Sequence, residues 1–91
     1  MIQKTIKVTN KLGIHARPAG MIVDITSRAH SDVTIIYEGS RANAKSILNV
    51  MMLAITPGSE VGFEIRGDDE NEVFQQLEKL FHENFHEETY A

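Results

Sequence analysis

The chain has 91 residues, of which 42% are apolar and 24% are charged, and it contains no cysteine. This length fits a single domain over residues 1–91, and the composition is that of a folded chain. Without cysteine the chain has no disulfide framework and no thiolate metal site, so a cytoplasmic protein is expected. No signal peptide and no stretch of membrane-spanning length is recognisable, so membrane insertion is not expected.

The formal net charge of -4 is unevenly distributed along the chain. Residues 1–45 contain seven Lys/Arg and three Asp/Glu, which gives +4, whereas residues 46–91 contain two and ten, which gives -8. A nucleic-acid-binding surface needs a denser basic patch with exposed aromatic side chains. The aromatic residues here occupy core-like positions, so nucleic-acid binding is not expected.

The first third of the chain predicts a strand followed by a helix. Apolar and polar residues alternate over residues 2–8, as in a strand with one buried face. After a break at Gly13, apolar residues recur at helical spacing. This helix is predicted to begin near Ala16, with Pro18 in its first turn and His30 at its end.

The remaining elements alternate in type. Residues 32–44 predict a hairpin, because two strand-like runs flank the turn sequence Glu-Gly-Ser. Ser46 is expected to cap a short apolar helix, residues 61–65 alternate as a strand, and residues 73–84 have the spacing of a final helix. The order β-α-β-β-α-β-α predicts an α+β fold, with three helices on one face of a four-stranded, mainly antiparallel sheet.

The stretch GIHARPAG, residues 13–20, carries the best candidate for chemistry. A helix that begins at Ala16 directs its unpaired N–H groups toward His15, and Arg17 adds a guanidinium that matches phosphate oxygens. A neutral imidazole can accept a phosphoryl group near pH 7. This geometry suits a phosphoryl carrier, and on these residues alone the alternative stays open that His15 is an ordinary exposed loop residue.

The segments TNKLGIHARPA and ANAKSILNVMML together resemble the HPr family, the histidine phosphocarriers of the bacterial phosphoenolpyruvate-dependent sugar phosphotransferase system. The resemblance implies an open-faced β-sandwich that acts as a monomer without a cofactor. It implies that enzyme I phosphorylates His15 to a pros-phosphohistidine, with phosphate on Nδ1, and that enzyme IIA domains then receive the phosphate. Arg17 and the backbone amides of Ala16 and Arg17 are expected to hold it.

Ser46 has two expected roles. The resemblance implies that an HPr kinase/phosphorylase modifies this serine and that a catabolite regulator then recognises the protein. The simpler alternative is that Ser46 serves only as a helix cap. Both roles are compatible, because a phosphate at a cap position lies beside helix amides.

Ile47, Leu48 and Met51 match the apolar surface that HPr proteins offer to enzyme I and enzyme IIA. Their spacing puts them on one side of the short helix while Val50 and Leu53 point elsewhere, so one set is expected to stay exposed. The alternative is that all of them fill the core. The cationic residues expected to rim this surface are Lys11, Arg17 and Lys45.

Several other functions stay open at this point. NKLGIHARPA also resembles NPr, the carrier of the nitrogen-related phosphotransferase branch, although Ala44-Lys45-Ser46 favours the sugar branch. A small hydrolase of acyl phosphates and a docking module that is never phosphorylated are further alternatives. No metal site is expected, because His82 and His86 are spaced to supply only two ligands from the last helix.

Overall fold

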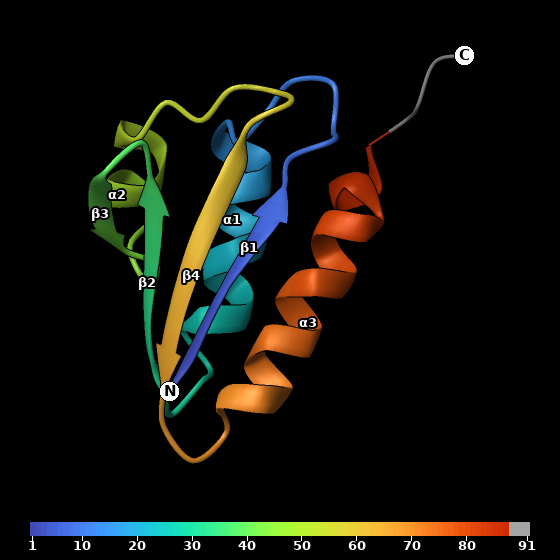
Figure 1. Ribbon diagram of the computed structural model, residues 1–91. Helices are drawn as coiled ribbons and strands as arrows, with labels where there is room; N and C mark the ends of the chain where they lie inside the picture. The colour runs from blue at the N-terminus through green and yellow to red at the C-terminus, as the bar shows by residue number, and fades with distance from the viewer. Residues whose placement is uncertain (88–91) are drawn as a thin grey trace.

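The order of elements predicted from the sequence is confirmed. The computed structural model describes residues 1–87. Its elements, shown in Figure 1, are β1 (Ile2–Lys7), α1 (Ala16–Thr26), β2 (Asp32–Tyr37), β3 (Ser40–Asn43), α2 (Ile47–Met52), β4 (Glu60–Arg66), α3 (Glu70–His82) and a short 3-10 turn, η1 (Asn84–His86).

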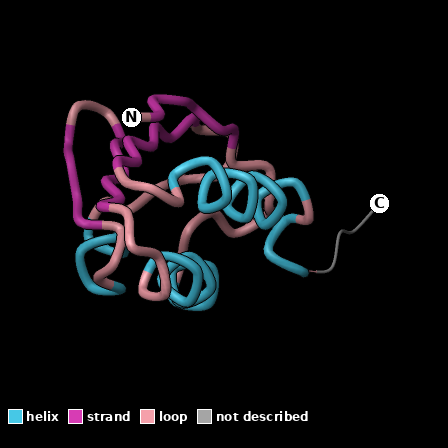
Figure 2. The backbone as a smooth tube through the Cα atoms, turned by 90° about the horizontal axis from the view of Figure 1, so that it is seen from below, coloured by secondary structure: helices cyan, strands magenta, loops and turns pink. Residues whose placement is uncertain are grey.

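The four strands form one antiparallel sheet in the order β1-β4-β2-β3. The central strand β4 pairs with β1 through Ile6 and Val61, and with β2 through Val33 and Ile65. Seen from below, the helices lie on one side of the sheet and leave the other side uncovered (Figure 2). The predicted α+β arrangement with three helices on one face is therefore confirmed.

The core lies between the sheet and the helices. Alternate strand residues face the helices and are buried, as the period-2 pattern of β4 predicts. The ring of Phe63 on β4 meets Phe81 on α3 edge to face, with 5.7 Å between the ring centroids. Other fully buried apolar residues are Val8, Ile22, Ile35, Val50, Val61, Ile65, Leu77 and Phe85.

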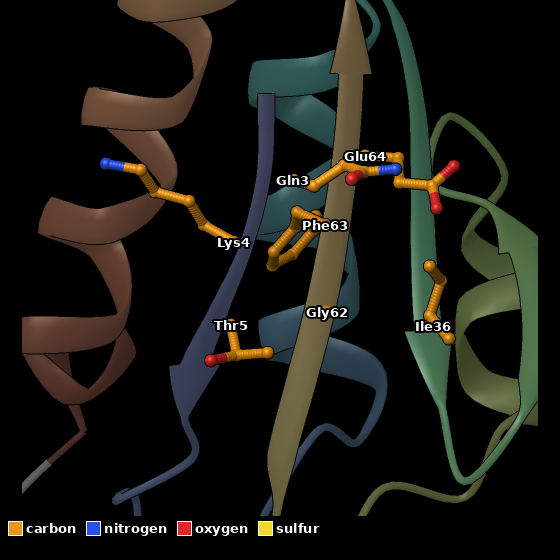
Figure 3. A pocket seen from close by; sticks show the side chains of 7 residues that line it. All are labelled: Gln3, Lys4, Thr5, Ile36, Gly62, Phe63 and Glu64. Carbon is orange, nitrogen blue, oxygen red and sulfur yellow. The ribbon is translucent and has the colours of Figure 1, made fainter. Parts of the chain in front are cut away.

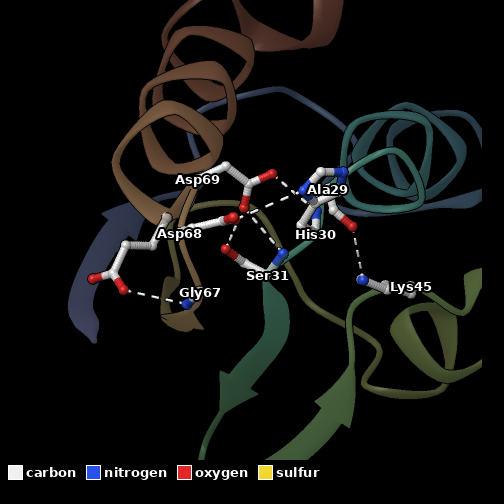
Figure 4. Close-up of polar contacts among 8 residues, drawn as sticks. Ala29, His30, Ser31, Lys45, Gly67, Asp68 and Asp69 are labelled. Atoms are coloured by element: carbon white, nitrogen blue, oxygen red, sulfur yellow. Dashed lines mark hydrogen bonds and ion pairs between the residues drawn. The ribbon is translucent and has the colours of Figure 1, made fainter.

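The first helix ends earlier than the sequence predicts. α1 stops at Thr26 rather than at His30. Beyond the helix, the Asp69 carboxylate accepts hydrogen bonds from the backbone N–H groups of His30 (2.8 Å) and Ser31 (3.0 Å), so these two residues bond to a distant side chain instead of to the preceding turn. Figure 4 shows this cluster, in which the Ser31 hydroxyl also donates to Asp69. These bonds hold His30 and Ser31 outside the helix, just before β2.

The last helix also ends before the predicted boundary. α3 stops at His82, and Asn84 starts η1 instead of continuing the helix. Asn84, Phe85 and His86 have φ values of 52°, 56° and 57°, so the backbone turns with left-handed geometry here. The chain after α3 therefore changes direction sharply, which places Glu87 beside the loop that precedes α1.

The uncovered face of the sheet carries a shallow depression (Figure 3). Thr5, Ile36 and Glu64 point from three neighbouring strands around Gly62, which has no side chain to fill the space. No helix within residues 1–87 is long and apolar enough to cross a membrane.

Candidate functional site

The loop that precedes α1 holds a conformation that requires glycine. Gly13 has a φ of +71°, and a Cβ atom at this position would lie 2.6 Å from the carbonyl oxygen of Ile55. The next residue, Ile14, donates its N–H to that same oxygen at 3.1 Å. The Asn10 side chain donates to the Gly13 carbonyl at 2.7 Å. The loop is thus held on both sides, and it delivers His15 to the start of α1.

His15 is the N-cap residue of α1. Its carbonyl accepts the first helical hydrogen bond, from the N–H of Ala19 at 2.9 Å. Within residues 1–87 the N–H groups of Ala16 and Arg17 have no acceptor, and Pro18 has no N–H. Two unpaired donors and the positive end of the helix dipole therefore lie next to the imidazole, whose side chain is 38% exposed.

Arg17 is exposed on the first turn of α1. Its guanidinium has no hydrogen-bond partner among residues 1–87, and its charge acts on Glu87 through space. A guanidinium beside unpaired helix amides can bind two oxygens of a phosphoryl group. Arg17 lies two positions after His15, in the first turn of the helix that His15 precedes.

Glu87 is a site residue that the sequence analysis missed. Its carboxylate oxygen Oε2 lies 2.9 Å from His15 Nε2, and Oε1 accepts from the Asn10 Nδ2 group at 2.7 Å. Two hydrogen bonds lower the pKa of the Glu87 carboxyl group, and the one with His15 has a larger effect than the one with Asn10. The carboxylate is therefore ionised at neutral pH, and its side chain is only 12% exposed.

The left-handed turn η1 brings Glu87 to His15. Left-handed backbone costs roughly 1–2 kcal/mol for each residue other than glycine. The buried ring of Phe85 offsets this conformational free energy by packing against Phe81, with 4.7 Å between the ring centroids. The Thr9 hydroxyl also donates to the Asn84 side-chain oxygen at 2.6 Å. The η1 turn and the β1–α1 loop thus meet at one end of the molecule (Figure 1).

Ser46 caps α2, as predicted. Its Oγ accepts a hydrogen bond from the Asn49 N–H at 3.2 Å. The start of α2 is tied to the end of α1, because the Thr26 hydroxyl donates to the Ala44 carbonyl at 2.6 Å. The segment after α2 contacts the loop before His15. α2 therefore runs antiparallel to α1, and its C-terminal end, not Ser46, is directed toward His15.

The exposed side of α2 forms what we call the apolar patch, made of Ile47, Leu48, Met51 and Met52. Their exposed fractions are 45%, 67%, 40% and 73%, whereas Val50 is buried. The prediction that one set of α2 side chains stays exposed is confirmed. Met52, which the sequence analysis did not name, is the most exposed of the four.

The cations predicted to rim the apolar patch differ in their exposure to solvent. Lys45 is half-buried, and its Nζ donates to the Ala29 carbonyl at 3.1 Å (Figure 4). It therefore joins the end of α1 to the start of α2 and is not a free cation of the rim. Lys11 and Arg17 are exposed in the loop and helix around His15.

The other three histidines are His30, His82 and His86. His82 ends α3, while His86 lies in η1 and contacts Glu83, with 3.3 Å between Nε2 and Oε1. The two histidines therefore do not share a helix as the sequence analysis assumed. His30 and Asp68 approach within 3.7 Å near Asp69 on the surface, and the Asp69 oxygens are already occupied by the backbone and hydroxyl donors described above.

Known proteins with a similar sequence and structure identify the family. A family model described as the phosphorylation site of the PTS HPr component matches residues 2–83. The phosphocarrier protein HPr of Treponema pallidum is 42% identical, over 97% of this chain and 100% of that protein. The HPr-like protein Crh of Bacillus subtilis is 40% identical, over 85% of this chain and 91% of Crh.

The solved structures agree with the sequence relatives. The crystal structure of HPr-C-His from Thermoanaerobacter tengcongensis matches with a TM-score of 0.93 and 37% identity, covering 98% of this chain and all of that one. The fold, the helix-capping histidine and these relatives lead to one assignment. The chain belongs to the HPr family of the phosphotransferase system, whose members shuttle phosphoryl groups from enzyme I to enzyme II as relay carriers rather than as catalysts.

Proposed function

We propose that His15 is the residue that carries the phosphoryl group and that Nδ1 is the atom that bonds phosphorus. The observation that carries this proposal is the position of His15 as the N-cap of α1, beside the unpaired amides of Ala16 and Arg17. The other ring nitrogen, Nε2, is engaged by Glu87, which leaves Nδ1 for phosphorus. A pros-phosphohistidine follows.

The same geometry suits a group that must be held and then passed on. A phosphoryl group carries a charge of about -1.5 to -2 near neutral pH. The helix amides and the Arg17 guanidinium stabilise this negative charge. The ring is partly exposed, so a partner can reach the phosphorus from solvent. A hydrolase would also need a positioned water, and the relay role of the family does not require one.

The apolar patch on α2 is the proposed docking surface for enzyme I and for enzyme IIA domains. Ile47, Leu48, Met51 and Met52 are exposed on the helix whose C-terminal end is directed toward His15. A partner that covers them also covers the approach to the imidazole. Exposed apolar side chains beside a reactive group are typical of transient interfaces.

We assign the carrier to the sugar branch, because the relative from Treponema pallidum is named a phosphocarrier protein HPr. An NPr-type role would instead require phosphorylation by the enzyme I of the nitrogen-related branch. Rates measured with each enzyme I at equal concentration separate the two. A monomeric state and a cytoplasmic location stay predictions from the sequence.

Ser46 is the proposed regulatory site. Phosphorylation by an HPr kinase/phosphorylase would put about two negative charges beside Ile47 and Leu48, in the proposed docking surface. The relative Crh, 40% identical to this chain, is named a catabolite repression HPr, which supports a second role with a catabolite regulator. Incubation with the kinase and ATP, followed by phosphopeptide mapping, tests whether Ser46 is modified.

The test of the carrier assignment is the intact mass after incubation with enzyme I and phosphoenolpyruvate. The wild-type protein should gain one acid-labile phosphoryl group, and His15→Ala should gain none while keeping its circular dichroism spectrum. His82→Ala removes an exposed histidine at the end of α3 and is the matched control. Full labelling of a folded His15→Ala variant would contradict the assignment, and a docking module that is never phosphorylated would show no labelling in any variant.

A further inference from the structure

We propose that Glu87 is a positioning residue for phosphoryl transfer: its carboxylate keeps the proton of the neutral His15 ring on Nε2, so that Nδ1 carries the lone pair that attacks phosphorus. This inference rests on the proposed role of His15. It extends to a residue outside the 2–83 segment that the family model matches.

The direction of the hydrogen bond between the two side chains follows from their chemistry. An ionised carboxylate can only accept hydrogen bonds, so Nε2 must donate across the 2.9 Å contact with Glu87. A neutral imidazole carries one proton, and a proton on Nε2 leaves the lone pair on Nδ1. Within residues 1–87 Nδ1 has no hydrogen-bond partner. The nucleophilic nitrogen is thereby defined before any partner binds.

Asn10 fixes the carboxylate in this role. Its Nδ2 group donates both to the Gly13 carbonyl and to Glu87 Oε1, each at 2.7 Å, and the side chain is almost completely buried. Within the described residues the Asn10 Oδ1 atom has no hydrogen-bond partner, so both hydrogen bonds of this side-chain amide are donated by its nitrogen. A group that faces Asn10 Nδ2 from position 87 must therefore be an acceptor.

The backbone before Glu87 has a conformation that tertiary contacts must stabilise. Three successive residues, Asn84 to His86, hold left-handed φ values without a glycine among them. Such backbone persists only where surrounding contacts over-determine it. Phe85 is buried and Asn84 is bound by Thr9, and both contacts belong to the turn that returns the chain to His15. The turn and the hydrogen bonds together hold one arrangement of the ring.

The transfer step uses the tautomer that Glu87 holds. The Nδ1 electron pair forms the new bond to phosphorus as the bond between phosphorus and the donor's leaving atom breaks, and the donor keeps the electrons of that bond. The ring retains its proton on Nε2 and gains positive charge. The negative carboxylate of Glu87 stabilises this positive charge, and it forms no bond to phosphorus.

The isosteric variant Glu87→Gln gives a sharp test, because glutamine has only one acceptor atom. With its oxygen facing Asn10 Nδ2, its NH₂ group faces His15 Nε2, and the ring must then accept at Nε2 and carry its proton on Nδ1. Nitrogen-15 NMR of the neutral form of the His15 ring reports which ring nitrogen carries the proton. We expect the proton on Nε2 in wild type and on Nδ1 in Glu87→Gln. Glu83→Gln removes a nearby carboxylate that contacts His86 and is the control.

Transfer rates supply a second readout that a packing role would not reproduce. With enzyme I as donor, we expect wild type to be fastest, Glu87→Ala to be slower, and Glu87→Gln to be slowest, by about tenfold relative to wild type, with the loss in kcat. If Glu87 only filled space, the isosteric glutamine would behave like wild type and alanine would be worst. That order of rates, or a proton on Nε2 in Glu87→Gln, would overturn the proposal.

The two proposals fail in different ways. The NMR measurement uses the unphosphorylated protein and does not depend on which residue enzyme I modifies. Labelling of a folded His15→Ala variant would refute the carrier assignment even if the tautomer responded to Glu87 as expected. Conversely, loss of labelling in His15→Ala with an unchanged tautomer in Glu87→Gln would keep His15 as the carrier and remove Glu87 from its positioning role.

Discussion

The ring of Phe85 packs against the ring of Phe81 at an interplanar angle of 63°, although the backbone of Phe85 itself is left-handed. Phe81 in turn meets Phe63 of the central strand. This row of three buried rings joins the sheet to the turn that carries Glu87. The aromatic core and the position of the His15 partner are therefore physically connected.

Phe85→Ala should destabilise the fold by about 3 kcal/mol, because it removes a buried ring and leaves a cavity. It should also release the turn, so that the contact between Glu87 and His15 is lost. Urea unfolding measures the first effect, and the His15 ring signals in NMR measure the second. Leu48→Ala truncates an exposed apolar side chain and should change stability by less than about 0.5 kcal/mol. Equal stability of Phe85→Ala and wild type would show that the row of rings does not support the turn.

Asp69 should make stability depend on pH in the acid range. Hydrogen bonds lower the pKa of the Asp69 carboxyl group. The one from the Ser31 hydroxyl has the largest effect, and the one from the His30 backbone is second. Because the unfolded chain binds this proton more readily, the stabilisation is present above about pH 4, the unfolded value, and is lost as the pH falls through the lower folded value. Asp69→Asn should flatten the pH dependence of unfolding below about pH 4.

Unfolding by urea between about pH 2.5 and pH 7 measures this dependence. Asp24→Asn changes an exposed carboxyl group on α1, which pairs with Arg28 just beyond the helix, and is the control. An identical slope for wild type and Asp69→Asn would mean that the cluster at the end of α1 does not contribute to acid unfolding.

Arg17→Lys should slow phosphoryl transfer about tenfold although the charge is kept. Lysine has a single point-like ammonium and cannot present the paired donors of a guanidinium to two phosphate oxygens. Steady-state transfer from enzyme I measures the effect on kcat/KM. Arg28→Lys makes the same change at an exposed position just after α1 and should leave the rate unchanged. Transfer at the wild-type rate would remove Arg17 from the site.

Ser46→Asp should raise the apparent KM for this protein with enzyme I and leave kcat nearly unchanged. The added charge lies beside the apolar patch, at the end of α2 directed away from His15, so it should act on docking rather than on the transfer step. High salt should partly restore the KM, because it screens exposed charges. A fall in kcat at unchanged KM would place the effect at the imidazole instead.

Ser46→Ala separates the charge from the cap. This variant loses the hydrogen bond to the Asn49 N–H and should cost about 1 kcal/mol of stability, while the transfer rate stays near wild type. Aspartate also caps helices well, so α2 should persist in Ser46→Asp. Circular dichroism of both variants checks this, and loss of helix in Ser46→Asp would mean that unfolding, not charge, explains its slower transfer.

Much of the architecture could be predicted from the sequence because it depends on contacts between near neighbours. The alternation in β4, the start of α1 after His15 and the cap at Ser46 each involve residues within a few positions of one another. The motif around His15 likewise brings the imidazole, Arg17 and the first helix amides together through local backbone geometry alone. Those features were therefore readable before any tertiary contact was known.

Only the tertiary structure decided where α1 ends and what His15 contacts. Helical spacing continues past Thr26, but Asp69, 39 positions beyond His30, binds the backbone N–H of His30 and keeps that residue out of the helix. Glu87 reaches His15 across 72 positions, through a left-handed turn that its residue types do not favour. Burial of Phe85 and hydrogen bonds to distant residues stabilise that turn, and neither effect leaves a periodic signal in the chain.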